Sequence, residues 1–203
     1  EQWLDMRWPS GKHVRQSFTV KPKEYETQYI TIKDEREVSP LPADLERIAK
    51  EQAISQKVLS TWSDDIPDFS FMHPVEAPIS SAYGLRRFYN NEPRSPHSGL
   101  DIAAPQGTPI RAPADAIVLQ TGDNFFFDGN VVYLGHGESL ITVYCHMSRI
   151  DVKSGQQVKQ GDIIGLVGAT GRATGPHLHW GVYLNGTPVD PNLFLVERYP
   201  GSD

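Results

Sequence analysis

The sequence contains a single cysteine, Cys145, among its 203 residues. One thiol cannot form an intramolecular disulfide, so the cysteine content gives no sign of an oxidising or a reducing compartment. A free cysteine is usually a small buried apolar residue, and we interpret Cys145 in this way.

Long apolar runs and excess positive charge are also lacking. No apolar stretch approaches the roughly 18 residues that a helix needs to cross a bilayer. The formal net charge is -6 and no basic block stands out, which argues against nucleic acid as the main partner. No signal peptide opens the chain, but Glu1 is not an initiator methionine. We therefore expect a mature or trimmed N-terminus, from which nothing follows about export.

Glycine is scarce in the first part of the chain, where Gly11 is the only one before Gly84. All the others except Gly201 lie between Gly84 and Gly186. This shift indicates a change of architecture. We place an N-terminal segment at residues 1–66, a main domain at 67–196 and a C-terminal tail at 197–203.

The N-terminal segment shows two short strand patterns, "RQSFTV" at 15–20 and "TQYITI" at 27–32, and one amphipathic helix within 39–62. Ser39 or Asp44 could cap this helix, and Leu45, Ile48, Ala49, Leu59 and Trp62 would form its apolar face. Two strands alone do not make a stable sheet. The segment therefore docks on the main domain or is the tail of a larger domain, and we favour the second reading.

The main domain reads as β structure. After a connector rich in proline and aspartate, short alternating or apolar runs recur at intervals of about ten residues. They are separated by Gly, Asn and Asp turns and lie at 77–84, 108–122, 130–137, 140–147, 162–170 and 177–189. This spacing predicts a mainly β fold, an antiparallel sandwich or open barrel.

Two histidines share one face of a predicted strand. In "TGPHLHWGVYLNG", residues 174–186, His177 and His179 are one residue apart. Side chains at i and i+2 of a strand lie on the same face, roughly 6–7 Å apart at their Cα atoms, while Leu178 points into the core. The pair indicates a metal or proton-transfer site near the end of a sheet.

A second cluster strengthens the case for a metal. In "PHSGLDIAAP", His97 and Asp101 are four residues apart, and imidazole nitrogen and carboxylate oxygen are both good zinc ligands. With one histidine of the 177/179 pair they would supply three ligands and leave a fourth position open, as in catalytic sites. The other histidine and His146 would lie near the metal, where they could transfer protons or stabilise an oxyanion. Strand periodicity leaves open which histidine of the pair binds the metal.

Three motifs carry a family resemblance. "HSGLD", "YCHMS" and "GPHLHWGVY" occur in this order, with "GDIIGLVGATGRATGPHLH" spanning the approach to the last. Together they resemble the lysostaphin/LytM-type zinc metallopeptidases, which hydrolyse the peptide bridges of bacterial cell-wall peptidoglycan. The resemblance covers about residues 74–195.

The resemblance implies one zinc ion per chain, held by His97, Asp101 and His179. It further implies that His146 and His177 flank the metal-bound water as general base and transition-state stabiliser. These role assignments come from the family and not from strand periodicity.

The resemblance also implies a zinc metalloendopeptidase that acts on peptidoglycan stem peptides and is periplasmic or otherwise exported. The acidic chain and its "NEPRSPHSGLDIAAP" lead-in look more like Gram-negative relatives, so we favour a D,D-endopeptidase that cuts D-Ala–diaminopimelate bridges. The alternative is a non-catalytic or latent module that binds peptidoglycan or activates other wall hydrolases. A biotinyl/lipoyl-type carrier is disfavoured, because Lys153 and Lys159 lack the flanking pattern. The oligomeric state stays open.

Several other residues receive more modest interpretations. Tyr83 and Tyr144 are assigned to core or rim packing, and His136 to a turn. Arg86 and Arg87 are interpreted as solvated, with contact to stem-peptide carboxylates as the alternative. The stretch at 122–130, "GDNFFFDGN", is either a groove wall or a strand edge tucked under the N-terminal helix.

Some relatives carry N-terminal parts that cover the groove. We therefore hypothesise that residues 1–65 pack beside the groove of this chain and restrict access to it.

Overall fold

The structure is a computed structural model that describes residues 2–197 and 199. The prediction of a mainly β fold is confirmed, since strands form one large sheet and several smaller ones, and α1 (Pro42–Leu59) is the α-helix of the described residues. Short 3-10 turns η1 (Glu35–Glu37) and η2 (Pro191–Leu193) complete the elements. No helix in these residues combines the length and the apolar character needed to cross a bilayer.

The large sheet has the strand order β13-β9-β10-β11-β15-β7-β4, with β16 paired to β15. Its pairings are all antiparallel. The strands are β4 (Ile79–Ser81), β7 (Gly99–Ile102), β9 (Ala116–Phe125), β10 (Gly129–Gly135), β11 (Leu140–Met147), β13 (Gln157–Val158), β15 (Leu178–Leu184) and β16 (Thr187–Val189). The patterns at 130–137, 140–147 and 177–189 therefore predicted real strands.

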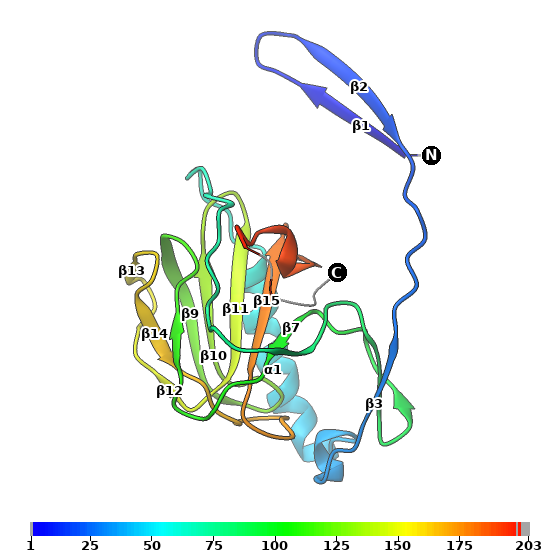
Figure 1. Cartoon of the computed structure of the whole chain (residues 1–203), viewed down its shortest axis with the longest axis vertical. Coiled ribbons are helices and arrows are strands. Elements are labelled where there is room, and N and C mark those ends of the chain that lie inside the picture. The colour runs from blue at the N-terminus through cyan, green and yellow to red at the C-terminus, as the bar shows by residue number, and fades with distance from the viewer. Residues whose placement is uncertain (1, 198, 200–203) are drawn as a thin grey trace.

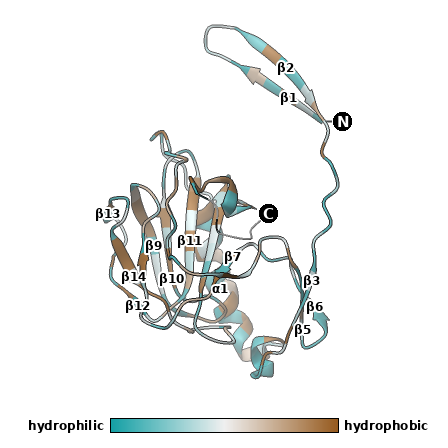
Figure 2. Ribbon diagram, in the orientation of Figure 1, coloured by the Kyte–Doolittle hydropathy of each residue, from teal (hydrophilic) through white to brown (hydrophobic). Residues whose placement is uncertain are grey.

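A second sheet covers one face of the large one and closes the sandwich. It has the order β12-β14-β8, formed by β8 (Pro109–Arg111), β12 (Arg149–Ile150) and β14 (Ile163–Leu166). Ile110 and Ile164 of this sheet pack in one cluster with Leu178 and Trp180 of β15, and all four are fully buried. Leu178 thus points into the core, as predicted. Figure 2 shows the hydrophobic residues of these strands.

Helix α1 lies against the opposite face of the large sheet (Figure 1). Val58 of the helix packs in a cluster with the sheet residues Phe125, Tyr133 and Cys145. Cys145 is 3% exposed, which fits its interpretation as a buried apolar residue.

The predicted cap and apolar face of α1 need correction. The N-cap is Leu41 and not Ser39 or Asp44; Ser39 lies outside the helix, and Asp44 lies at its third position, where the carboxylate accepts from the backbone nitrogen of Leu41. Leu45 and Trp62 are 53% and 59% exposed, so they are not part of the buried face. The buried stripe is narrow because a single sheet face covers it, and it passes through Ile48, at 8% exposed.

The N-terminal strands divide into two groups. β1 (Gln2–Arg7) and β2 (His13–Phe18) form a hairpin that pairs with no other strand among the described residues and lies away from the body in Figure 1. β3 (Thr27–Ile30) pairs in parallel with β5 (Arg86–Tyr89), which also pairs with β6 (Glu92–Pro93). The two predicted N-terminal strands thus exist, but they do not pair with each other.

Two contacts hold the C-terminal end of the main domain, and the residue that follows it, against the connector at the start of the domain. Phe71 forms a bridge with Leu195, and the ring of His73 stacks on Tyr199 at 3.9 Å between centroids. Within the predicted tail at 197–203, residues 198 and 200–203 lie outside the described residues.

Candidate metal centre and groove

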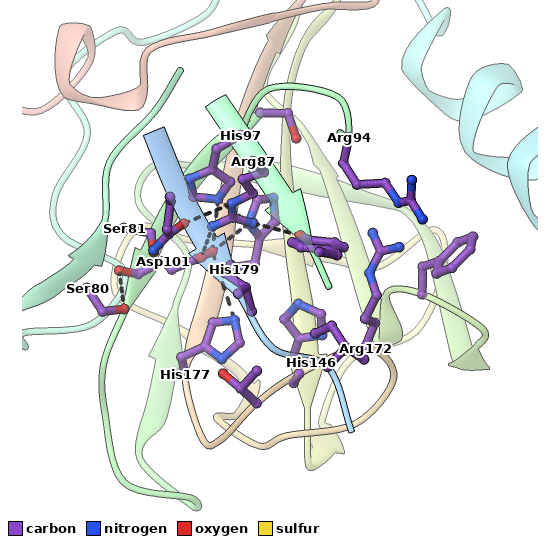
Figure 3. A pocket seen from close by; sticks show the side chains of 18 of the residues that line it. Ser80, Ser81, Arg87, Arg94, His97, Asp101, His146, Arg172, His177 and His179 are labelled. Carbon is purple, nitrogen blue, oxygen red and sulfur yellow. Dashed lines mark hydrogen bonds and ion pairs between the residues drawn. The ribbon is translucent and has the colours of Figure 1, made fainter. Parts of the chain in front are cut away.

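Neighbouring strands of the large sheet bring the predicted site residues together. Asp101 of β7 lies directly opposite His179 of β15, and Cys145 of β11 faces His179 from the other side. His146 follows Cys145 in β11. His177 directly precedes β15, where it bridges to Gly168. Figure 3 shows the labelled histidines gathered around Asp101.

Three donor atoms converge at one point. Nε2 of His97 and Nδ1 of His179 are 3.0 Å apart, and they lie 3.0 Å and 2.8 Å from Oδ1 of Asp101. His97 and Asp101 are buried, at 3% and 7% exposed. Two imidazole nitrogens and one carboxylate oxygen are a ligand set that zinc accepts in catalytic sites. The residues present therefore fit a zinc ion, with an open side for a further ligand.

The protonation states favour metal binding. Nδ1 of His97 lies 2.6 Å from the carbonyl oxygen of Ala82, which can only accept, so Nδ1 carries the proton and Nε2 presents its lone pair to the site. Burial lowers the pKa of His97 and keeps the ring neutral. Nη2 of Arg87 donates to Oδ2 of Asp101, and this largely buried ion pair favours the ionised form of the carboxylate. Neutral imidazoles and an ionised carboxylate are the forms that bind metal.

His146 and His177 stand beside this cluster with their rings 4.7 Å apart. Each anchors Nδ1 on a carbonyl oxygen, His146 on Thr170 and His177 on Gly175, both at 2.9 Å. The other ring nitrogen therefore carries a lone pair that can accept a proton. Burial, with the nearby His177 and His179, lowers the pKa of His146 to about 3, so its ring is neutral at physiological pH.

A pocket of about 680 Å³ opens over all five predicted residues. The structure thus brings together every side chain that the sequence singled out, while the division into metal ligands and proton-transfer residues stays a prediction. The N-terminal segment contributes to the wall of this pocket through Gln28, Ile30, Ile32 and Gln52. Arg94 and Arg172 supply positive charge to the same wall.

The stretch at 122–130 was predicted to form either a groove wall or a strand edge under the N-terminal helix, and its phenylalanines take part in both. Phe125 is 9% exposed and packs with Val58 of α1, as expected of a strand edge under the helix. Phe127 lines the pocket, where the guanidinium of Arg172 lies 4.3 Å above its ring. The same guanidinium lies 4.7 Å above the ring of Tyr89.

The remaining residues act mainly in packing. Tyr144 is fully buried and Tyr83 donates to the carbonyl oxygen of Pro188, and neither lines the pocket. His136 is more than a turn residue, because it is 6% exposed and its Nε2 lies 2.9 Å from Oγ1 of Thr142.

The prediction that Arg87 is solvated is wrong. Its side chain is 11% exposed rather than solvated, and its Nη2 donates to Oδ2 of Asp101 at 2.5 Å. No local pattern identifies this contact, because Arg87 lies on β5 and Asp101 on β7, and these two strands belong to different sheets.

Comparison with known proteins identifies the family. Residues 95–191 match the model of Peptidase family M23. A crystal structure from Pseudomonas aeruginosa that is assigned to peptidase M23 is 41% identical, with a TM-score of 0.75, and the match covers 95% of this chain and 72% of that one. The chain belongs to peptidase family M23. The expected resemblance is thereby confirmed.

Other M23 proteins resemble the chain over shorter stretches. The peptidoglycan DD-endopeptidase ShyA of Vibrio cholerae is 44% identical over 121 residues, which cover 58% of this chain and 28% of ShyA. The catalytic domain of lysostaphin from Staphylococcus simulans is 32% identical with a TM-score of 0.50, over 57% of this chain and 89% of that domain. The chain thus spans little more than a quarter of ShyA. The M23 match includes all five predicted site residues but none of β3, β5 and α1.

Proposed function

We propose that this M23 peptidase is a zinc-dependent endopeptidase that hydrolyses peptide cross-links of bacterial peptidoglycan. The observation that carries the proposal is the convergence of three donor atoms next to two further histidines, each with a lone pair free for proton transfer. A purely structural metal site would have four protein ligands and no such neighbours.

In the proposed mechanism His97, Asp101 and His179 hold the zinc ion. When bound, zinc supplies Lewis-acid polarisation of the scissile carbonyl. The chain's own contribution is to fix Asp101 and His179 opposite each other on paired strands, with His97 just before β7, and to keep the ring of His97 neutral through burial.

His146 and His177 divide the proton transfer between them. One accepts the proton of the attacking water as general base and then passes that same proton to the leaving amine, while the other, when protonated on its outward ring nitrogen, donates to the oxyanion. Because Nδ1 of each ring is anchored on a carbonyl oxygen, both rings keep their orientation during this exchange.

For the substrate we propose D-Ala–diaminopimelate cross-links between stem peptides, with the protein acting in the periplasm or elsewhere in the cell envelope. Support comes from the names of relatives, the DD-endopeptidase ShyA and the DD-carboxypeptidase/endopeptidase Mpg of Neisseria meningitidis. Arg94 and Arg172 in the pocket wall are suited to the carboxylates of such peptides.

The test uses zinc-loaded protein and purified cross-linked muropeptide dimers of the diaminopimelate type, with mass spectrometry to follow conversion to monomers. We expect cleavage by the wild type, none by His179→Ala, and a kcat reduced by about 10²–10⁴ in His177→Gln, with zinc retained. Intact dimers with the wild type would contradict the D,D-specificity, and pentaglycine bridges would then be the next substrate. Absence of cleavage of both, with zinc bound, would leave the alternative of a latent or binding module.

One observation favours latency as a second candidate property. Residues of β3 and α1 form part of the pocket wall, so the segment at 1–66 borders the groove of the domain at 67–196, a division that we retain as a proposal. We propose that residues 1–65 restrict access of intact peptidoglycan. Equal activity of the zinc-saturated protein on intact peptidoglycan before and after their removal would contradict this proposal.

A further inference from the structure

The two oxygens of Asp101 have separate partners. Oδ1 faces the ring nitrogens of His97 and His179, whereas Oδ2 accepts from Nη2 of Arg87 at 2.5 Å. The side chains of Arg87 and Asp101 are 11% and 10% exposed, so water competes little for this ion pair. A carboxylate held in this way offers only one oxygen to a metal.

Arg87 is itself held by the N-terminal segment. Gln28 lies beside Arg87 in the parallel pairing of β3 with β5. Oε1 of Gln28 accepts from Nε of Arg87 at 3.2 Å, and its Nε2 donates to Oγ of Ser81 at 2.7 Å. Nη1 of Arg87 donates to the hydroxyl of Tyr89 at 3.3 Å. Three polar contacts thus fix the guanidinium plane from different directions. Figure 3 shows Arg87 lying against Asp101 and Ser81 nearby.

We propose that Gln28 and Arg87 are positioning residues that hold Asp101 as a one-oxygen ligand of the metal. Strand β3 is then part of the support of the metal centre, although it lies outside the stretch that matches the M23 model. The inference rests on the proposed zinc site. Groups that hydrogen-bond a metal ligand from behind orient it, and their loss typically weakens metal binding about 10–100-fold.

A substitution at Gln28 can test the orientation of Arg87 without removing the positive charge of Arg87. Arg87 carries a positive charge that by itself repels a zinc ion, so replacing Arg87 by a neutral residue would change two effects of opposite sign. Gln28→Leu keeps that charge and removes only the hydrogen bonds that orient the guanidinium. Gln28→Glu keeps an oxygen acceptor for Nε of Arg87 but adds a negative charge, so it should bind Zn²⁺ at least as tightly as the wild type.

A matched control lies next to Gln28 on the same strand. Tyr29 is 69% exposed and stacks on Phe88 with ring centroids 5.0 Å apart. Tyr29→Ala weakens the packing of β3 on β5 without touching the contacts of Gln28 or Arg87. It therefore reports what a general loosening of β3 does to the metal centre.

The experiment measures the affinity of each full-length variant for Zn²⁺ by competition with a chelating dye, and the visible absorption of the Co²⁺-substituted protein. We expect about 10-fold weaker Zn²⁺ binding and an altered Co²⁺ spectrum for Gln28→Leu, wild-type behaviour for Tyr29→Ala, and an affinity no weaker than that of the wild type for Gln28→Glu. Arg87→Lys, which keeps the charge but loses the Nε donor, is the second variant should Gln28→Leu fail to fold, and the same loss is expected.

Wild-type affinity and spectrum in folded Gln28→Leu, or in Arg87→Lys, would overturn the inference. An equal loss in Tyr29→Ala would also overturn it, in favour of simple docking of β3. A wild type that binds no Zn²⁺ would defeat the proposed function as well, so the two failures are distinguishable.

Discussion

Strands β15 and β1 are of similar length and each carries a tryptophan, but their surroundings are opposite. β15 pairs with β11 on one edge and with β7 on the other, and Trp180 is fully buried. β1 pairs with β2 alone among the described strands, and Trp3 is 51% exposed. The strand that presents His179 is therefore hydrogen-bonded to a neighbouring strand along both of its edges, whereas β1 is hydrogen-bonded along one edge only.

This difference explains why the candidate site lies where it does. A metal site needs its donor atoms held within about 0.5 Å, which side chains on rigid paired strands achieve better than loops or isolated hairpins. The hairpin has the same secondary structure but lacks the packing that would give its side chains such precision. Substitutions in the two regions should therefore differ sharply in effect.

The largest effect is expected at Asp101. Asp101→Ala removes the oxygen shared by His97 and His179 and leaves Arg87 without its carboxylate partner. We expect loss of stoichiometric zinc and at least a ~10³-fold loss of endopeptidase activity. Metal analysis and muropeptide cleavage measure these two quantities.

Asp5→Ala in the hairpin is the matched control, because Asp5 pairs with His13 at the surface and lies on β1, which pairs only with β2 among the described strands. Retained zinc and activity are expected for it. Comparable losses in both variants would mean that the two regions are not independent.

The next largest effect is expected at Gly99, where β7 passes close to β15. A Cβ at this position would lie 2.3 Å from the carbonyl oxygen of Trp180 and 3.0 Å from Cε1 of His179. Gly99→Ala should therefore destabilise the protein by about 2 kcal/mol or more, because backbone has to move. Urea unfolding measures this, with Gly175→Ala as control, since nothing lies within 4 Å of an added Cβ there. Equal stability of both variants would contradict the close approach.

A buried histidine of the sheet region, His136, should make the stability of the folded protein sensitive to acid. Burial lowers the pKa of His136 from 6.5 to about 4. Between these values the unfolded chain binds the proton and the folded chain does not, so stability is lost as the pH falls from 6.5 towards 4. His136 alone should lower the free energy of unfolding by about 2 kcal/mol from about pH 7 to pH 5.

Denaturant unfolding at both pH values, with the wild type and His136→Gln, measures this contribution. The variant should show the shallower pH dependence, since it lacks the titrating ring. Identical slopes in the two proteins would assign the acid sensitivity to other groups.

The smallest effect is expected in the hairpin. Trp3→Ala removes an exposed ring over which Arg15 lies at 4.6 Å, and no strand of the main domain pairs with β1. We expect a change below about 0.5 kcal/mol in unfolding of the main domain. Thermal unfolding followed by the near-UV signal of the buried aromatic residues checks this. A shift as large as that of Gly99→Ala would show that the hairpin packs on the main domain in solution.

The site was predictable because its signals are local. A two-residue period places His177 and His179 on one face and Leu178 on the other, and the structure has Leu178 fully buried. Short sequence spacing likewise links His97 to Asp101. The division of labour among these residues came from the family resemblance and still awaits measurement.

The support of the site was not predictable from local patterns. Gln28 and Arg87 meet through a parallel pairing of strands far apart in the sequence, and a polar pair of this kind leaves no periodic signal. The apolar face of α1 was misread at Leu45 and Trp62 for a related reason. An amphipathic pattern shows that a helix has an apolar side, but the partner surface decides how much of it is covered.

The alternation of side chains in β15 also constrains how the gene for this protein can change. A substitution at one codon affects one side chain, but inserting or deleting a single codon within the strand reverses the facing of every residue beyond it. With a one-residue change just before His179, Trp180 would turn toward the pocket while His179 entered the core. The lineage of this strand can therefore accumulate point mutations, whereas changes of length have to fall in the turns at either end.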